Sequence, residues 1–111
     1  MTSPVLVVLT NCPNVEVARR IASALVESGL AACVNEMAAV RSTYYWQDKL
    51  ETQTEIPLLI KTTARRYPEV QAAICAMHPH AVPEIIALPV ITGFAPYLRW
   101  VEDETQPSQL A

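Results

Sequence analysis

Residues 77–90 have the sequence MHPHAVPEIIALPV, and they join an apolar helical pattern to an apolar strand pattern. Three prolines in this segment each fix a backbone φ angle and remove an amide donor, so the connection follows a defined path. The chain's two histidines, His78 and His80, lie here together with Glu84. All three side chains can bind a cation or exchange a proton near neutral pH, so the segment is a candidate functional site.

Strand and helix patterns alternate on the N-terminal side of this segment. Residues 5–9 are a short apolar run, typical of a strand that is covered on both faces. Apolar residues then recur at helical spacing after Pro13, until Gly29 ends the pattern. A second helix is predicted to begin near Pro68 and to stop before Pro79.

A long hairpin is predicted between the two helices. Residues 32–46 form its first strand, residues 47–49 its turn and residues 50–62 its return strand. Asp48 tolerates the left-handed backbone that such a turn requires, and Pro57 predicts a bulge or an unpaired stretch. Strands this long exceed the usual 5 or 6 residues, so the tip is expected to project from the core or contact a partner.

The C-terminal part of the chain supplies the last two predicted elements. Residues 84–91 are expected to form a core strand, and Pro96 opens a short amphipathic helix. Residues 102–111 are expected to be a flexible tail of a single domain that spans residues 1–111. The order β-α-β-β-α-β predicts a ferredoxin-like α+β sandwich with a long β-hairpin and a short C-terminal helix.

Such a sandwich carries both main helices on one face of its sheet. The other face therefore needs a partner, and the aromatic residues Tyr44, Tyr45 and Trp46 of the hairpin are candidates to supply contacts between subunits.

Composition narrows the classes of function. The chain has 111 residues, of which 51% are hydrophobic, enough for one core without disulfides or metal. The net charge is −3 with no run of basic residues, which argues against a nucleic-acid partner. No signal peptide or membrane span is recognisable, so we expect a cytoplasmic protein without a membrane partner.

The three cysteines show no CxxC spacing, which argues against a disulfide framework and a zinc ribbon. Cys33 and Cys75 lie in apolar sequence and are predicted to be core residues. Cys12 follows the first strand, where a helix N-terminus lowers a thiol pKa, so it is a candidate reactive residue; the alternative is an ordinary turn residue.

Two candidate sites follow from the remaining polar residues. His78 and His80 alternate around a proline and are candidate metal ligands, with Glu84 as an oxygen donor; the alternative is a helix-ending His78 and an exposed His80. Lys61 and Glu84 lie at strand ends, and with Trp46 and Tyr97 they are predicted to line a ligand pocket between subunits. The alternative for Lys61 and Glu84 is an ion pair that satisfies charges near the core.

Four motifs together carry a family resemblance. They are LAACVN at 30–35, STYYWQDK at 42–49, EIPLLIKT at 55–62 and HPHAVPEI at 78–85. In this order they resemble the CutA family of divalent-cation-tolerance proteins. The resemblance implies a PII-like homotrimer, joined through its hairpins, that binds copper or another divalent cation weakly and needs no cofactor to fold. It implies a role in cation tolerance and no enzymatic activity.

The resemblance also suggests which residues bind copper. The family's site involves a cysteine at the end of the first strand and two consecutive histidines; here those positions hold Thr10, with the thiol displaced to Cys12, and Met77-His78. Of these positions only His78 carries over directly. His80 is added from its spacing to His78, and Cys12 for its displaced thiol, so the predicted metal residues are His78, His80 and Cys12. The alternative function is a PII-like regulatory trimer that binds a small molecule between subunits. An enzyme that uses Cys12 with His78 as its base is a third hypothesis, without a local motif to support it.

Overall fold

The protein has a mixed α+β fold, which confirms the predicted class. The computed structural model describes residues 3–107, and this part contains five strands and three helices. In chain order they are β1 (Val5–Cys12), α1 (Val15–Glu27), β2 (Cys33–Glu36), β3 (Val40–Trp46), β4 (Lys49–Thr63), α2 (Tyr67–Met77), β5 (Ile85–Pro89) and α3 (Ala95–Glu104).

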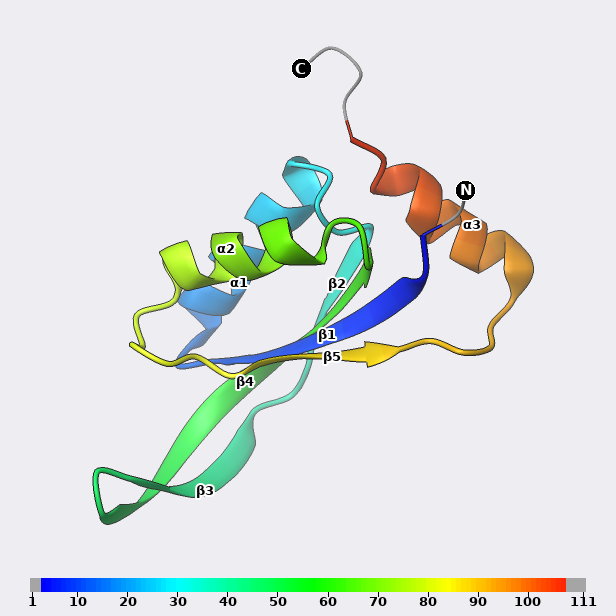
Figure 1. Ribbon diagram of the computed structural model, residues 1–111. Coiled ribbons are helices and arrows are strands. Elements are labelled where there is room, and N and C mark those ends of the chain that lie inside the picture. The colour runs from blue at the N-terminus through cyan, green and yellow to red at the C-terminus, as the bar shows by residue number, and fades with distance from the viewer. Residues whose placement is uncertain (1–2, 108–111) are drawn as a thin grey trace.

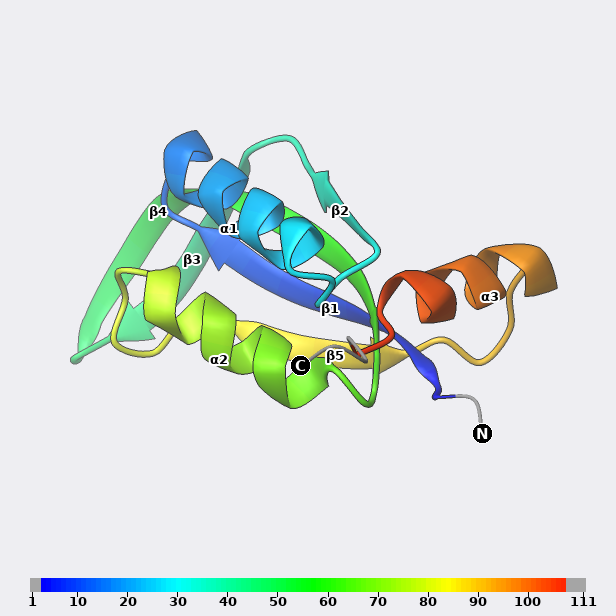
Figure 2. The same cartoon turned by 90° about the horizontal axis from the view of Figure 1, so that it is seen from above.

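One antiparallel sheet organises these elements. Its strands lie in the order β2-β4-β1-β5, and β3 pairs with the part of β4 that extends beyond β2. The helices α1 and α2 lie side by side on one face, while the β3–β4 hairpin projects from one end and α3 lies beyond the other (Figure 1, Figure 2). None of the helices in residues 3–107 is long and apolar enough to cross a membrane.

The ends of α1 follow from its sequence. The Asn14 side chain accepts a hydrogen bond of 2.8 Å from the backbone N–H of Val17, which caps the first turn. At the other end Gly29 has a φ of 74°, the left-handed conformation that closes a helix. The predicted stop at Gly29 is therefore confirmed.

The hairpin confirms two details predicted from single residues. Gln47 and Asp48 have φ angles of 51° and 65°, so both central residues of the two-residue turn are left-handed. The first strand of the hairpin is interrupted opposite Pro57: residues 37–39 lie across from only Ile56 and Pro57. This extra residue is a bulge, and it divides the predicted strand 32–46 into β2 and β3.

The core lies between the sheet and the helices α1 and α2. Alternate residues of β1 and β4 face the helices, and apolar residues at helical spacing meet them. Burying one leucine or isoleucine there contributes about 1.5–3 kcal/mol. The buried members include Val8, Cys12, Ile21, Leu25, Leu58, Ile60, Val70 and Ile74.

The opposite face of the sheet stays partly uncovered. On this open face, Leu9 lies beside Ile86 and Val7 beside Leu88, and the two β5 side chains are 49% and 50% exposed. β5 is therefore an exposed edge strand that pairs only with β1, and the predicted core strand over residues 84–91 is wrong in this respect. β5 is apolar in sequence, yet every residue from Ile86 to Pro89 is exposed in this structure.

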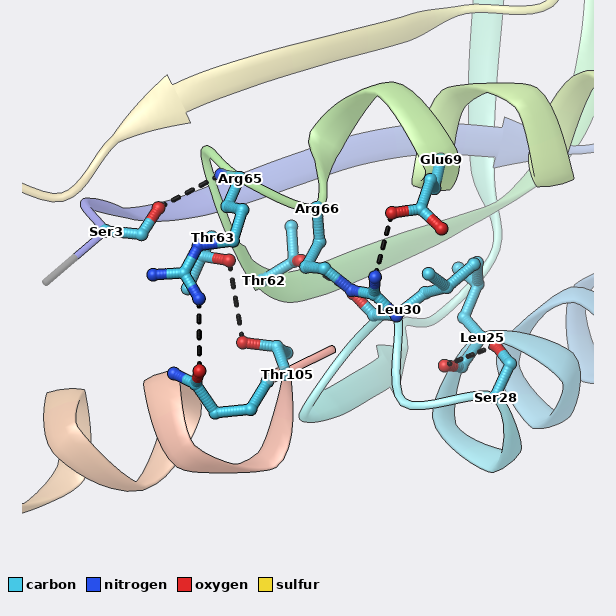
Figure 3. A network of polar contacts seen from close by, with 11 residues as sticks. Ser3, Leu25, Ser28, Leu30, Thr62, Thr63, Arg65, Arg66, Glu69 and Thr105 are labelled. Atoms are coloured by element: carbon cyan, nitrogen blue, oxygen red, sulfur yellow. Dashed lines mark hydrogen bonds and ion pairs between the residues drawn. The ribbon is translucent and has the colours of Figure 1, made fainter. Parts of the chain in front are cut away.

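The C-terminal helix α3 extends further than predicted and is anchored to the sheet. Residues 102–104 are helical and Thr105 is buried, so the tail predicted from residue 102 is wrong at its start. The Thr63 and Thr105 hydroxyls lie 3.5 Å apart, and Arg65 donates to Gln106 at 3.0 Å (Figure 3). These contacts fix the end of α3 beside the end of β4. The rest of the predicted tail includes residues 108–111, which lie outside the described residues.

Candidate functional site

A hollow of about 770 Å³ lies between the β3–β4 hairpin and the loop that connects α2 to β5. We call it the hairpin hollow. Its wall includes Trp46, His80 and Glu84, three of the residues predicted as site residues from the sequence. The fold thus brings together one candidate metal ligand and two members of the predicted ligand pocket.

The hairpin contributes two aromatic and two acidic side chains to the hollow. In the β3–β4 register, Tyr44 lies opposite Glu51 and Val40 lies opposite Glu55. Because side chains alternate along a strand, Trp46 lies on this same side of the hairpin. Tyr44, Trp46, Glu51 and Glu55 all line the hollow.

The loop after α2 contributes His80 and Glu84, and His78 lies behind them. Pro79 cannot continue the helix, so α2 ends at Met77. His78 is only 6% exposed and does not line the hollow. Its ring nitrogens contact the carbonyl oxygen of Asn11, at 2.7 Å, and the backbone nitrogen of His80, at 3.1 Å.

The hollow is strongly acidic. It contains the carboxylates of Glu51, Glu55 and Glu84, and none of its lining residues is a lysine or arginine. Glu84 accepts a hydrogen bond of 3.4 Å from the Asn11 side chain, which is long and leaves the carboxylate exposed. Three like charges in one concave surface attract cations, and the imidazole of His80 adds a nitrogen donor.

The described residues do not supply a complete coordination sphere for a metal ion. Within residues 3–107, no group of three His, Cys, Asp or Glu side chains is placed so that it could hold a metal ion. A transition-metal ion in a protein commonly has four or more ligands. An ion at His80 or Glu84 would therefore take further ligands from water or from another subunit.

Cys12 is a core residue rather than a turn residue. It ends β1 and is fully buried, beside Ile56 of β4 in the sheet register. Burial, and to a smaller extent the negative charge of Glu55, raise the pKa of the Cys12 thiol to about 11. The predicted lowering of the Cys12 pKa is wrong, because desolvation disfavours the thiolate here.

The other two cysteines are also placed differently from the prediction. Cys33 is half-buried, and it lies beside Lys61 on the side of the sheet away from α1 and α2. Cys75 is exposed on α2 because it follows the buried Ile74 by one residue and so points away from the core. Neither thiol is a member of the main core.

Lys61 and Tyr97 lie away from the hairpin hollow. Lys61 donates a hydrogen bond to the Asn35 side chain on the neighbouring strand. Tyr97 lies on α3 beside Trp100; burial raises its pKa, and the nearby Cys33 contributes in the same direction. Within one protomer the four residues predicted for a ligand pocket thus form two groups, and the pocket between subunits stays a prediction.

Sequence reasoning did not predict the two hairpin glutamates or Asn11 as site residues, although all line the hollow. Glu51 and Glu55 lie four positions apart on one strand, and Asn11 joins them from β1. The period of two residues in a strand places Glu51 and Glu55 on one side, so this signal was present in the sequence. The sequence did not indicate that the loop between α2 and β5, which contains His80, lies beside the hairpin.

Comparison with known proteins identifies the family. The family model described as "CutA1 divalent ion tolerance protein" matches residues 6–104. The chain belongs to the CutA1 family. A CutA1 crystal structure from a psychrotrophic Shewanella has the same fold, with a TM-score of 0.91 at 42% sequence identity; the match covers 96% of this chain and all of that one.

Named relatives of the CutA1 family extend from bacteria to mammals. The divalent-cation tolerance protein CutA of Thermus thermophilus is 46% identical over 99 residues, which are 89% of this chain and 96% of the relative. Protein CutA of the mouse is 44% identical over 95 residues, covering 86% of this chain. The chain spans only about half of the mouse protein, 54% of its length.

Proposed function

We propose that this protein acts in tolerance of divalent cations and binds such ions weakly at the hairpin hollow. The observation that carries the proposal is the hollow itself, whose lining residues include three glutamates and one histidine but no lysine or arginine. The names of CutA1 relatives, which refer to divalent-cation tolerance, support the same role. Weak binding follows because the described residues offer no preformed trio of ligands.

His80 and Glu84 are the proposed ligands from this chain. Imidazole nitrogen and carboxylate oxygen suit Cu(II) and Zn(II). Ligation by His78 would require one of its two hydrogen bonds to break, and ligation by Cys12 would require a buried thiol with a raised pKa to ionise. The proposal therefore gives these two predicted residues no direct contact with the ion. The core consists of apolar side chains, so we expect the protein to fold without metal.

Calorimetric titration of the metal-free protein with Cu(II), Zn(II) and Mg(II) tests this proposal. We expect Cu(II) and Zn(II) to bind. The His80→Gln and Glu84→Gln variants are each expected to bind about tenfold more weakly or worse, because even residues that only hydrogen-bond to a metal ligand typically change metal affinity about 10–100-fold when they are replaced. Glu104→Gln is the matched control, because Glu104 is an exposed carboxylate on α3, outside the hollow. Equal affinities in all four proteins would refute binding at the hollow.

A homotrimer is the second part of the proposal. The half-exposed Ile86 and Leu88 leave apolar surface on the open face, and Tyr45 and Leu50 near the hairpin tip are 73% and 62% exposed. Isolated protomers seldom leave so many large apolar side chains exposed on one sheet, and a second copy of the chain offers matching surfaces. Such an assembly could place Lys61 and Tyr97 of one subunit beside Trp46 and Glu84 of another and so form the predicted pocket between subunits.

A PII-like regulator that binds a small molecule is the second candidate function. The volume of the hollow favours it, because about 770 Å³ lies within the range of small-molecule pockets and exceeds what a single ion needs. The aromatic rings of Tyr44 and Trp46 supply apolar wall for such a ligand. A nucleotide panel in the same calorimeter distinguishes the two functions: saturable nucleotide binding that Trp46→Ala removes would favour the regulator.

We further propose that the protein binds its ligand without catalysing a reaction, and that it is located in the cytoplasm. The absence of catalysis is supported by Cys12, the candidate nucleophile, whose burial and raised pKa keep the thiol protonated. The cytoplasmic location is supported by the cysteines, since all three are free thiols, as is usual in a reducing compartment.

A further inference from the structure

The imidazole of His78 is fixed by two hydrogen bonds of opposite direction. Its Nε2 atom lies 2.7 Å from the carbonyl oxygen of Asn11, and a carbonyl can only accept, so Nε2 carries the proton. Its Nδ1 atom lies 3.1 Å from the backbone nitrogen of His80, whose N–H can only donate. The ring is therefore the neutral Nε2–H tautomer, and no lone pair remains for a metal ion.

Asn11 holds both ends of the same loop. Its carbonyl accepts from His78 at the start of the loop, and its side chain donates to Glu84 at the end, at 3.4 Å. Between these points Pro79 and Pro83 restrict the backbone. The His78 and His80 rings also pack edge to face, with their centroids 4.7 Å apart. These contacts attach the loop to the end of β1.

We propose that His78 is a positioning residue, which joins the loop 78–84 to β1 and thereby places His80 and Glu84 at the hairpin hollow. The part of this inference that concerns cation binding rests on the proposed function. In this role His78 does not contact the ion. Removing the His78 side chain weakens binding because the loop that carries His80 and Glu84 is no longer attached to β1. Loss of affinity in a His78→Ala variant is thus no evidence that His78 contacts the ion.

Two substitutions separate the two hydrogen bonds of His78. In His78→Asn, the side-chain oxygen occupies nearly the place of Nδ1 and still accepts from the N–H two residues later, as in an Asx turn, but it does not reach β1. In His78→Gln, the longer side chain places its NH₂ group near the position of Nε2 and keeps the bond to Asn11. Both variants retain a polar side chain of similar size, and sedimentation and thermal melting check their assembly and folding.

Electron paramagnetic resonance of the Cu(II)-loaded proteins distinguishes a positioning residue from a ligand. We expect His78→Asn, which loses the bond to β1, to bind Cu(II) about tenfold more weakly than the parent, and His78→Gln, which keeps that bond, to bind more tightly than His78→Asn. The nitrogen hyperfine pattern is expected to stay unchanged in both, because His80 still supplies the nitrogen. The His80→Gln variant is expected to lose that nitrogen signal. Two results would overturn the proposal: a nitrogen signal lost in the His78 variants and kept in His80→Gln, or parental affinity in His78→Asn.

Nuclear magnetic resonance of the metal-free parent tests the geometry without any ion. Long-range nitrogen–proton correlations of the imidazoles are expected to assign the Nε2–H tautomer to His78. A ring that averages between tautomers would overturn the positioning role alone. A parent with the expected tautomer that binds neither Cu(II) nor Zn(II) would overturn the proposed function, and with it the part of the inference that concerns binding.

Discussion

Replacing Leu88 with glutamate is expected to convert the proposed trimer into folded monomers at micromolar concentration. Leu88 is 50% exposed in the protomer and lies on the open face beside Val7, so the carboxylate stays in water when the chain is monomeric. In a trimer the same carboxylate would be buried against apolar surface without a partner, which costs about 3 kcal/mol or more for each copy. Such a cost lowers the association constant of each interface by roughly a hundredfold or more.

Sedimentation velocity of the parent, of Leu88→Glu and of Val26→Glu provides the measurement. Val26→Glu is the matched control, because Val26 is 45% exposed on α1 and therefore lies on the other side of the sheet. We expect the parent and the control to sediment as trimers. A parent that sediments as a monomer refutes the proposed assembly, whereas a Leu88→Glu protein that stays trimeric shows that the open face is not the interface.

Local features of the hairpin could be predicted from single residues, because they depend on backbone preferences. Asp48 was expected to accept a left-handed conformation, and both turn residues have positive φ angles. Pro57 was expected to mark a bulge, and the neighbouring strand carries one extra residue opposite it. In both cases a single side chain restricts the local backbone more strongly than distant contacts do.

The burial of individual cysteines could not be predicted from apolar neighbours alone. Apolar residues next to a cysteine in the sequence do not show which face of the strand or helix the cysteine occupies. Its position within the repeat of the strand or helix decides whether its side chain is buried or exposed. Cys12 alternates with Thr10 and Val8 on the helix-facing side of β1 and is buried. Cys75 follows Ile74 directly on α2 and is exposed.

The candidate site could be predicted only in part, since it is formed by two distant segments. Trp46 and Glu84 were predicted to share a pocket, and both line the hairpin hollow. Lys61 was grouped with them as a residue at a strand end, but β4 is 15 residues long, and Lys61 lies near its far end from the hairpin. For His78, the bonds to Asn11 and His80 decide its role, and such contacts become visible only once the loop is placed against β1.

Raising the pH from 9 to 11 is expected to reduce the free energy of unfolding by about 2 kcal/mol through Cys12 alone. The native state raises the pKa of this thiol from 9.0 to about 11. Below pH 9 the thiol is protonated in both states, so this contribution to stability is fully present. Between pH 9 and 11 the unfolded chain releases the proton and the native state retains it, so stability falls as the pH rises. A difference of two pKa units corresponds to about 2.7 kcal/mol.

Guanidinium denaturation of the parent, of Cys12→Ala and of Cys75→Ala, at several pH values between 8 and 11, measures this effect. Contributions of the other ionisable groups are shared by the three proteins and cancel in the differences. Protein concentration must be held constant, because dissociation of an oligomer also changes apparent stability. Cys75 is exposed, so its variant should follow the parent, whereas Cys12→Ala should lose less stability as the pH rises. Parallel curves for all three proteins would mean that the Cys12 thiol ionises as readily in the native state as in the unfolded chain.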